Sequence, residues 1–284
     1  MPSQLLWPAI KQAAASGVLA GGYGYAKNNW YVGANAPIFG RRVDSIEALL
    51  AIAEPGDIAF LGPQEYSEGN LVIPATLSPF TMIGMGNRGS SFIEPSTTTM
   101  EGLQVLADDV TLMNVGIAKG ATGDYALSVG SQAVSADRFR AYGCKIEGDG
   151  VAALLYGAGD VLLEDCEFCW CGTGIQFRSN DIGFNTQIYI RRCRFHDVLT
   201  ACLGHFAAAQ QVNGLNVEDS VFERDESGTP PVDYIMLSDN LNTGYFAGNR
   251  FAFATNEADT LAIGTGILWG PNGTEAGWST ARPS

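Results

Sequence analysis

Pairs of charged residues recur at a fixed interval along the chain and are the first groups that suggest chemistry. Glu164-Asp165, Arg191-Arg192 and Glu218-Asp219 follow one another at intervals of 27 residues. Glycoside hydrolysis needs two carboxyl groups about 5 to 9.5 Å apart, and neighbouring repeats could supply them. Arginines between the acids should lower the carboxyl pKa values, which does not suit a general acid. We therefore interpret the pairs as a surface charge ladder, with a sugar-binding or catalytic groove as the alternative.

Such a groove would draw acidic, basic and aromatic side chains from several repeats. It would follow one strand face and would hold an extended carbohydrate. The candidate binding residues are Asp149, Glu164, Trp170, Arg178, Asp181, Arg191 and Glu218. None of them matches a known catalytic motif, so no catalytic residue is assigned.

The six cysteines raise the question of a metal site or a disulfide. Three of them hold the same place in successive repeats, so we expect them to stack inside the fold as small apolar side chains. These are Cys144, Cys166 and Cys193.

A second group of cysteines lies close to a histidine of the next repeat. Cys169 and Cys171 are two residues apart and would point the same way in an extended strand, with His196 nearby. Buried thiols are the interpretation we favour, with zinc or a disulfide as alternatives. His196 and His205 are expected to be solvated or hydrogen-bonded strand residues. The sequence thus predicts no metal and no cofactor.

One apolar pattern recurs along the chain and must position these groups. Relative to one anchor residue per copy, apolar or small residues lie at offsets −5, −3, 0 and +2. Period two on either side of a two-residue break indicates two short strands joined by a bend, with both apolar rows facing inward. The anchors, separated by 29, 22, 27, 27 and 29 residues, are Val115, Cys144, Cys166, Cys193, Ser220 and Asn249.

A third extended run follows each anchor and completes a repeat of three short strands. The runs are 125–129, 151–156, 174–177, 200–203, 234–237 and 265–269. One repeat cannot bury its apolar row alone, whereas copies stacked about 4.8 Å apart bury a continuous column and pair each strand with its successor. The sequence therefore predicts an all-β fold, a parallel β-helix of seven to eight coils over residues 57–269.

The two ends of the chain are expected to differ from the solenoid. Residues 44–56 combine an N-cap with apolar residues at helical spacing, which predicts a short capping helix. Residues 1–43 are rich in Gly, Asn and Tyr and suggest an attachment and oligomerisation arm. Residues 270–284 would form a tail. The arm residues singled out are Tyr23, Tyr25, Trp30 and Tyr31.

Several short motifs at the start of the solenoid carry a family likeness. They are Trp30-Tyr31-Val32-Gly33, the segment 44–58, Pro63-Gln64-Glu65-Tyr66 and Met82-Ile83-Gly84-Met85-Gly86. Over roughly residues 30–253 the chain resembles right-handed β-helix proteins of the pectin-lyase-like superfamily. The resemblance implies a fold rather than one activity, because the superfamily includes lyases, hydrolases, phage tailspikes and inert virion proteins.

A pectate-type lyase would require calcium-binding carboxylates beside a Lys or Arg base. The sequence has only four lysines. Arg178 near Asp181 is the best remaining base candidate, with Asp149 or Glu164 as candidate ligands, and no family motif is matched residue by residue.

Composition narrows the function further. With 16 Lys plus Arg against 30 Asp plus Glu, the net charge of −14 argues against nucleic acid as a partner. No segment reads as membrane-spanning or as a secretory signal. We expect a non-catalytic bacteriophage virion protein assembled in the host cytoplasm: a spike, decoration or tail-associated subunit, homotrimeric by analogy with phage spikes, and bound to other virion proteins by its arm. A host-surface polysaccharide is a candidate ligand, and the alternative function is a polysaccharide lyase or hydrolase.

Overall fold

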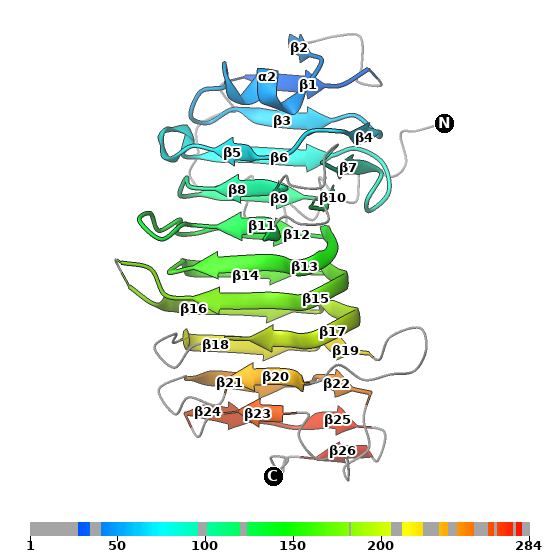
Figure 1. Cartoon of the computed structure of the whole chain (residues 1–284), viewed down its shortest axis with the longest axis vertical. Coiled ribbons are helices and arrows are strands. Elements are labelled where there is room, and N and C mark those ends of the chain that lie inside the picture. Colours follow the sequence, from blue (N-terminus) through cyan, green and yellow to red (C-terminus); the bar gives the residue numbers. More distant parts are fainter. Residues whose placement is uncertain are drawn as a thin grey trace.

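The chain winds into a tall stack of coils, drawn in Figure 1 from its blue end to its red end. The computed structural model describes residues 28–34, 41–95, 101–119, 124–181, 183–205, 212–223, 233–237, 243–252, 261–263, 266–274 and 277–279. In them the fold is an all-β parallel solenoid of about seven turns, which fits a right-handed parallel β-helix. The predicted fold class is confirmed.

The first face of the solenoid is an 11-stranded sheet with parallel pairing throughout. Its strands belong to successive coils, so neighbours in the sheet lie about one repeat apart in sequence. In sheet order they are β2 (Arg41–Val43), β1 (Asn29–Val32), β3 (Ile58–Leu61), β6 (Phe80–Gly84), β9 (Val110–Met113), β12 (Arg140–Tyr142), β14 (Gly159–Glu164), β16 (Asn185–Arg191), β18 (Val212–Glu218), β21 (Gly244–Ala247) and β24 (Ile267–Trp269).

The second face follows the bend after each of these strands and is part of a 15-stranded sheet. Its last strand pairs antiparallel with the one before it, whereas the other described pairings in this face are parallel. The strands are β4 (Glu65–Tyr66), β7 (Ser91–Ile93), β10 (Val115–Ile117), β13 (Lys145–Tyr156), β15 (Glu167–Arg178), β17 (Arg194–Gly204), β19 (Val221–Phe222), β22 (Arg250–Phe251), β25 (Asn272–Thr274) and β26 (Gly277–Ser279).

The third face belongs to the same sheet and closes each coil. In the middle coils the second and third runs are joined, because β13, β15 and β17 continue through register shifts into the third face. The separate strands of this face are β5 (Leu71–Ile73), β8 (Leu103–Val105), β11 (Tyr125–Val129), β20 (Asp233–Leu237) and β23 (Leu261–Ile263).

The predicted interior rows lie inside the solenoid. At offset −3 the register aligns Leu112 with Ala141, Leu163, Ile190, Val217 and Phe246 in turn. All six side chains are fully buried. At offset +2 four phenylalanines form a stack with ring centroids 4.9, 4.8 and 4.6 Å apart. They are Phe168, Phe195, Phe222 and Phe251.

The anchor column changes from thiols to polar side chains along the solenoid. Cys144, Cys166 and Cys193 are buried, as predicted. Cys166 Sγ donates to the carbonyl of Ala141, at 3.5 Å, and burial raises the pKa of this thiol well above its usual value. Further along, Ser220 and Asn249 are fully buried and use their side chains to satisfy backbone groups of neighbouring coils.

The bend before each anchor depends on one residue with left-handed backbone geometry. The six φ angles lie between 49° and 70°. Gly, Asn and Asp tolerate this region best, and five of the six positions hold one of them. The residues are Asn114, Gly143, Asp165, Arg192, Asp219 and Gly248.

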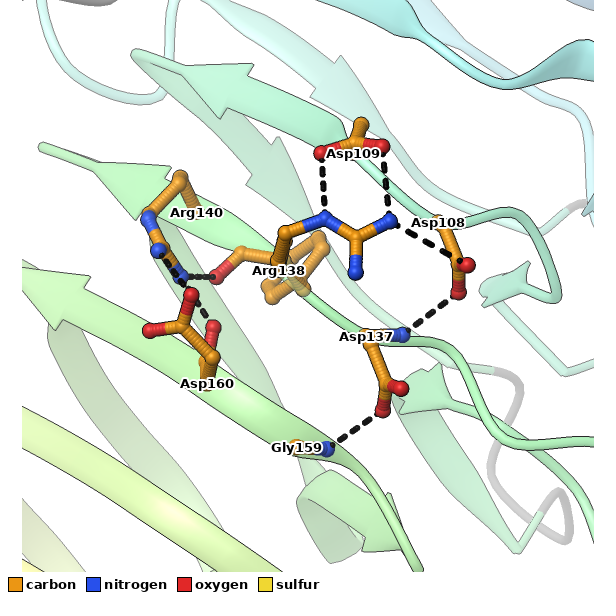
Figure 2. A network of polar contacts seen from close by, with 8 residues as sticks. Asp108, Asp109, Asp137, Arg138, Arg140, Gly159 and Asp160 are labelled. Atoms are coloured by element: carbon orange, nitrogen blue, oxygen red, sulfur yellow. Dashed lines mark hydrogen bonds and ion pairs between the residues drawn. The ribbon is translucent and has the colours of Figure 1, made fainter.

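A second corner, where each coil enters the first face, is clamped by charged side chains (Figure 2). Arg138 Nε donates to Asp109 at 2.7 Å, and its Nη2 lies 3.3 Å from Asp108. Asp108 accepts from the backbone N–H of Asp137, and Asp137 accepts from that of Gly159, each at 2.8 Å. These contacts connect three successive coils without leaving an unpaired acid between them.

The capping helix forms where it is expected but is shorter than residues 44–56. It is α2 (Ile46–Leu50), with Ser45 as N-cap accepting from the N–H of Ala48 at 3.0 Å. The Glu68 carboxylate also accepts from the first two helical N–H groups. Ile46 and Leu49 are fully buried and join the solenoid core.

The strand stack extends past both boundaries expected for the solenoid. β1 and β2 already pair in the first face, within the predicted arm. β25 pairs with β22, within the predicted tail. The expected third run at 265–269 is wrong, because β24 pairs with β21 in the first face and Leu261–Ile263 takes the third-face position beside β20. No helix among the described residues is long and apolar enough to cross a bilayer.

Candidate functional site

Titratable side chains gather on the outer side of the second face, in β13, β15 and β17. Register places Lys145 beside Glu167, and Glu167 beside Arg194. Two residues further along the strands, Glu147 lies beside Cys169, and Cys169 beside His196. Side chains alternate along a strand, so these two rows face away from the buried rows between them. The central members are Glu147, Glu167, Cys169, His196 and Asp197, which we call the second-face cluster.

His196 lies between two carboxylates. Its Nε2 is 2.9 Å from Glu167 Oε1, and its Nδ1 is 2.5 Å from Asp197 Oδ2. An ionised carboxylate only accepts hydrogen bonds, so each ring nitrogen of His196 faces an acceptor oxygen. The side chains of His196 and Asp197 are 14% and 8% exposed, which shields these contacts from water.

The charges around the cluster favour the ionised forms of its partners. Burial alone would raise the pKa of Glu167, but the hydrogen bond and charge of His196, together with Arg88, lower it below its usual range. Burial alone would lower the pKa of Lys145, but its ion pair with Glu147 raises it. These shifts suit charge recognition, because a general acid or base needs a pKa near the working pH.

Cys169 is buried on the outer side of β15. Its Sγ lies 3.6 Å from Glu147 Oε2, and burial raises the pKa of the thiol to about 12. Cys171 instead joins the interior core. The two cysteines therefore do not point the same way, because Trp170 between them has left-handed backbone geometry, with φ 51°, and shifts the register.

The same shift exposes an aromatic side chain at the corner between the second and third faces. Trp170 is 49% exposed, and Leu199 of the next coil is 63% exposed. Asp149 of the preceding coil is also exposed. Close backbone packing holds the corner, since a Cβ on Gly172 would lie only 3.2 Å from the Asp149 carbonyl oxygen.

The seven predicted groove residues lie at three separate places on the coil. Asp149 and Trp170 share the corner just described. Arg178 ends β15 with its guanidinium 5.8 Å from the Tyr156 ring centre, and Asp181 follows in the loop. The other three lie at the end of the first face. The sequence was therefore right about two neighbours at the corner, but it joined residues from different faces into one groove.

The first-face residues form the charge ladder. Arg191 Nε lies 3.0 Å from Glu218, and Arg192 lies 2.9 Å from both Glu164 and Asp165. The carboxylates of Glu164, Asp165 and Glu218 thus each face a guanidinium of a neighbouring coil, as the ladder interpretation predicts.

Two of the four predicted arm residues belong to the solenoid. Trp30 Nε1 donates to buried Asp57 at 2.7 Å, and the Tyr31 ring stacks on Phe60 with centroids 5.3 Å apart. Tyr23 and Tyr25 lie outside the described residues.

Sequence reasoning noted Cys169 and His196 as neighbours but missed their carboxylate partners. The signal was present in the repeat: Lys145, Glu167 and Arg194 all lie one place after an anchor, and Glu147, Cys169 and His196 lie three places after one. Residues at the same outward offset in successive repeats stack above one another, so the offsets +1 and +3 predict the cluster. His205 is buried directly after β17.

Comparison with known proteins supports the fold. No family model matches the sequence. No curated protein sequence matches it significantly either. Among solved structures, a pectate lyase is similar with TM-score 0.55 at 12% identity, covering 89% of this chain and 69% of that one.

Two further solved structures are similar. An alginate lyase from Paenibacillus sp. str. FPU-7 has TM-score 0.54 and 14% identity, covering 82% of this chain and 93% of that one. A pectin methylesterase in complex with a hexasaccharide has TM-score 0.51 and 12% identity, covering 81% and 79%. At these identities the likeness shows the shared pectin-lyase-like β-helix fold and no activity.

Proposed function

We propose that the protein binds an extended polysaccharide along its second face and the adjoining corner, without cleaving it. The observation that carries this proposal is the exposed indole of Trp170, held by a backbone shift beside a row of charged side chains. A large aromatic side chain that stays half in water on a rigid strand is a surface for stacking.

The corner offers both kinds of contact that a sugar ring needs. The apolar face of a sugar stacks on the Trp170 indole, with Leu199 of the next coil extending the apolar surface. The Asp149 carboxylate accepts hydrogen bonds from hydroxyl groups. Because strands of neighbouring coils are about 4.8 Å apart, successive coils present such contacts at regular intervals to a long chain.

The pKa directions of the charged groups in the cluster support binding of a polysaccharide rather than cleavage of its bonds. Glu167 has a lowered pKa and Lys145 a raised one, so both stay charged near neutral pH. Both nitrogens of His196 are occupied by carboxylates. None of these three groups is poised to transfer a proton to a substrate.

The comparisons support a carbohydrate ligand. A pectate lyase and an alginate lyase share the fold, and a pectin methylesterase of this fold holds a hexasaccharide. The alternative is an enzyme, a polysaccharide lyase or hydrolase. Unlike the proposed binding protein, such an enzyme would release cleaved polysaccharide.

The test measures binding to a panel of acidic and neutral polysaccharides by affinity electrophoresis, with Trp170→Ala as the key variant. Loss of one stacking contact of about 1 to 1.5 kcal/mol weakens binding roughly tenfold. Tyr245→Ala is the matched control, because Tyr245 is a 38% exposed aromatic residue on the first face, and it should bind like the parent.

Reducing ends and unsaturated uronate absorbance are followed in the same mixtures. Equal binding by Trp170→Ala and the parent, or no binding to any polysaccharide, would overturn the proposal. Release of product would replace binding alone with the lyase or hydrolase function.

We further propose that this polysaccharide-binding protein is a bacteriophage virion subunit, homotrimeric and attached by residues 1–27. The charge of −14, the four lysines and the Gly- and Tyr-rich start of the chain support it. Since Trp30 bonds to buried Asp57, an arm deletion must end before Asn28 to leave the solenoid intact.

Light scattering of the full chain tests the trimer, with a monomer as the contrary result. Removal of residues 1–27 should leave the cooperative urea unfolding of the solenoid in place and abolish incorporation into particles. Normal incorporation of the truncated chain would remove the attachment role.

A further inference from the structure

We propose that Glu167, Cys169 and His196 form a binding site for one transition-metal dication of the zinc class. Their ligand atoms, a carboxylate oxygen, a thiol sulfur and an imidazole nitrogen, all lie within 4.8 Å of one another. This site lies beside the polysaccharide-binding corner but does not depend on the function proposed above.

The strands hold these three side chains on one surface. Cys169 in β15 and His196 in β17 are directly paired in register, and Glu167 lies two residues before Cys169 on the same side of its strand. Sites built on paired strands are more rigid than sites on loops, so the ligands need little reorganisation.

The donor set selects the type of metal. Sulfur, nitrogen and carboxylate oxygen together are typical ligands of zinc, whereas calcium and magnesium take oxygen ligands. Zinc bonds of about 2.0 to 2.3 Å place ligand atoms roughly 3 to 4 Å apart, so side-chain shifts of about 1 Å close the site. His196 Nε2 and Glu167 Oε1 are already 2.9 Å apart.

Asp197 supplies the partner that a metal-binding histidine normally has. Its carboxylate accepts from Nδ1 of His196, at 2.5 Å, which leaves Nε2 as the metal-facing nitrogen. Asp197 has left-handed backbone geometry, with φ 52°, and is 7% exposed. Asp197 is therefore a positioning residue rather than a ligand.

Two cations border the site, Arg88 and Lys145, and Lys145 is paired with the Glu147 oxygen that faces Cys169. Arg88 contacts Oε2 of Glu167, on the other side of the carboxylate from His196. Glu147, 3.6 Å from the Cys169 sulfur, lies where a fourth ligand would come from, and water is the other candidate for that position. On binding, the metal takes the place of the contact between Nε2 and Oε1, and the Cys169 thiol gives up its proton as it becomes a thiolate ligand.

The experiment titrates the chelator-treated full chain with Co²⁺ and Zn²⁺. We expect one Co²⁺ per chain, with visible bands of a four-coordinate ion and a near-ultraviolet thiolate band, all displaced by Zn²⁺. Cys169→Ser should lose the thiolate band, and Glu167→Gln and His196→Ala should lose at least tenfold in affinity. Asp197→Asn should weaken binding 10- to 100-fold while keeping the thiolate band.

Cys171→Ala is the matched control, since Cys171 lies in the same strand but faces the core. It should retain the thiolate band. Glu147→Gln removes a carboxylate beside the site and should also weaken binding while keeping the thiolate band. If the parent binds neither ion, or if Cys169→Ser, Glu167→Gln and His196→Ala, each folded by circular dichroism, bind as the parent does, the site does not exist. Polysaccharide binding is measured separately, so failure of either proposal is recognised on its own.

Discussion

Asn249 and Asn272 lie one coil apart in the interior column, where Asn272 Oδ1 accepts from the backbone N–H of Asn249 at 3.0 Å. Asn249 in turn accepts from the N–H of Ser220 at 2.9 Å and donates to the carbonyl of Val217 at 2.9 Å. The side chains of Ser220, Asn249 and Asn272 are all fully buried. The C-terminal coils are thus held together by side-chain bonds to the backbone at the bend, where the strand ladders are interrupted.

Replacing Asn249 with Ala should therefore destabilise the solenoid strongly. The N–H of Ser220 loses its partner in the interior, and each buried group left unsatisfied costs about 1 to 3 kcal/mol. We expect the free energy of unfolding in urea to fall by about 2 to 4 kcal/mol. Asn216→Ala is the control, because within the described part of the chain the Asn216 side chain bonds only to the nearby Gly214 carbonyl on the outer side. Equal effects of the two variants would contradict the role of the column.

The phenylalanine stack makes a second prediction. Phe222 is fully buried with neighbouring ring centroids 4.8 and 4.6 Å away, so Phe222→Ala removes two ring contacts and leaves a cavity. A loss of about 3 to 5 kcal/mol is expected in urea unfolding. Phe60→Ala on the outer side, where the half-buried ring stacks on Tyr31 and packs against the small cluster of Ile83, Met113 and Tyr142, should cost less than Phe222→Ala. A loss below 1 kcal/mol for Phe222→Ala would be inconsistent with a packed stack.

The bend before each anchor can be tested at Gly143. Its φ is +60°, yet no atom lies within 4 Å of the position a Cβ would take. Gly143→Ala should therefore cost about 1 kcal/mol by backbone strain alone, and Gly143→Asn should cost less. Gly183 also has open space and no positive φ, so Gly183→Ala should be close to neutral. Thermal unfolding compares the three, and equal values for Gly143→Ala and Gly183→Ala would remove the strain argument.

Alkaline pH should destabilise the fold through Tyr125. Burial, followed by the charges of Glu101 and Asp124, raises its pKa to about 12 from a usual value of 10.0. The folded state therefore keeps the phenol neutral where the unfolded chain ionises, so stability is full below pH 10 and is lost as pH rises towards 12. Tyr125→Phe should lose less stability than the parent between pH 9 and pH 11.5 in urea unfolding. Tyr245→Phe, on the exposed first face, should follow the parent, and an identical pH profile for Tyr125→Phe would contradict the shift.

The sequence predicts the interior of this molecule better than its outside. Offsets −5, −3, 0 and +2 are set by burial of apolar side chains, and a strand slipped by one residue would expose the whole row. The paired charges of Arg192 and Asp165 were predictable for the same reason, since they share the repeat.

The exposed corner at Trp170 and the placement of Asp197 depend on local backbone geometry that the apolar pattern does not encode. Trp170 and Asp197 both have φ near 51°. At neither position does the apolar pattern predict an interruption of the strand. Strand alternation turns Cys169 outward beside Glu167 and His196, whereas the shift at Trp170 turns Cys171 inward. The misplaced run at 265–269 has a related cause, because its apolar residues suit a third-face strand and a first-face strand equally well.

The antiparallel pairing of β26 with β25 also has a consequence for solubility. A solenoid whose last coil ends in a bare parallel strand offers its free N–H and C=O groups to the first coil of another molecule, and growth into fibres can follow. Here Asn272 is aligned with Ser279 on a strand that runs backwards. In this sheet the first coil of an incoming molecule would meet a strand of reversed direction, which disfavours parallel addition in register at this edge.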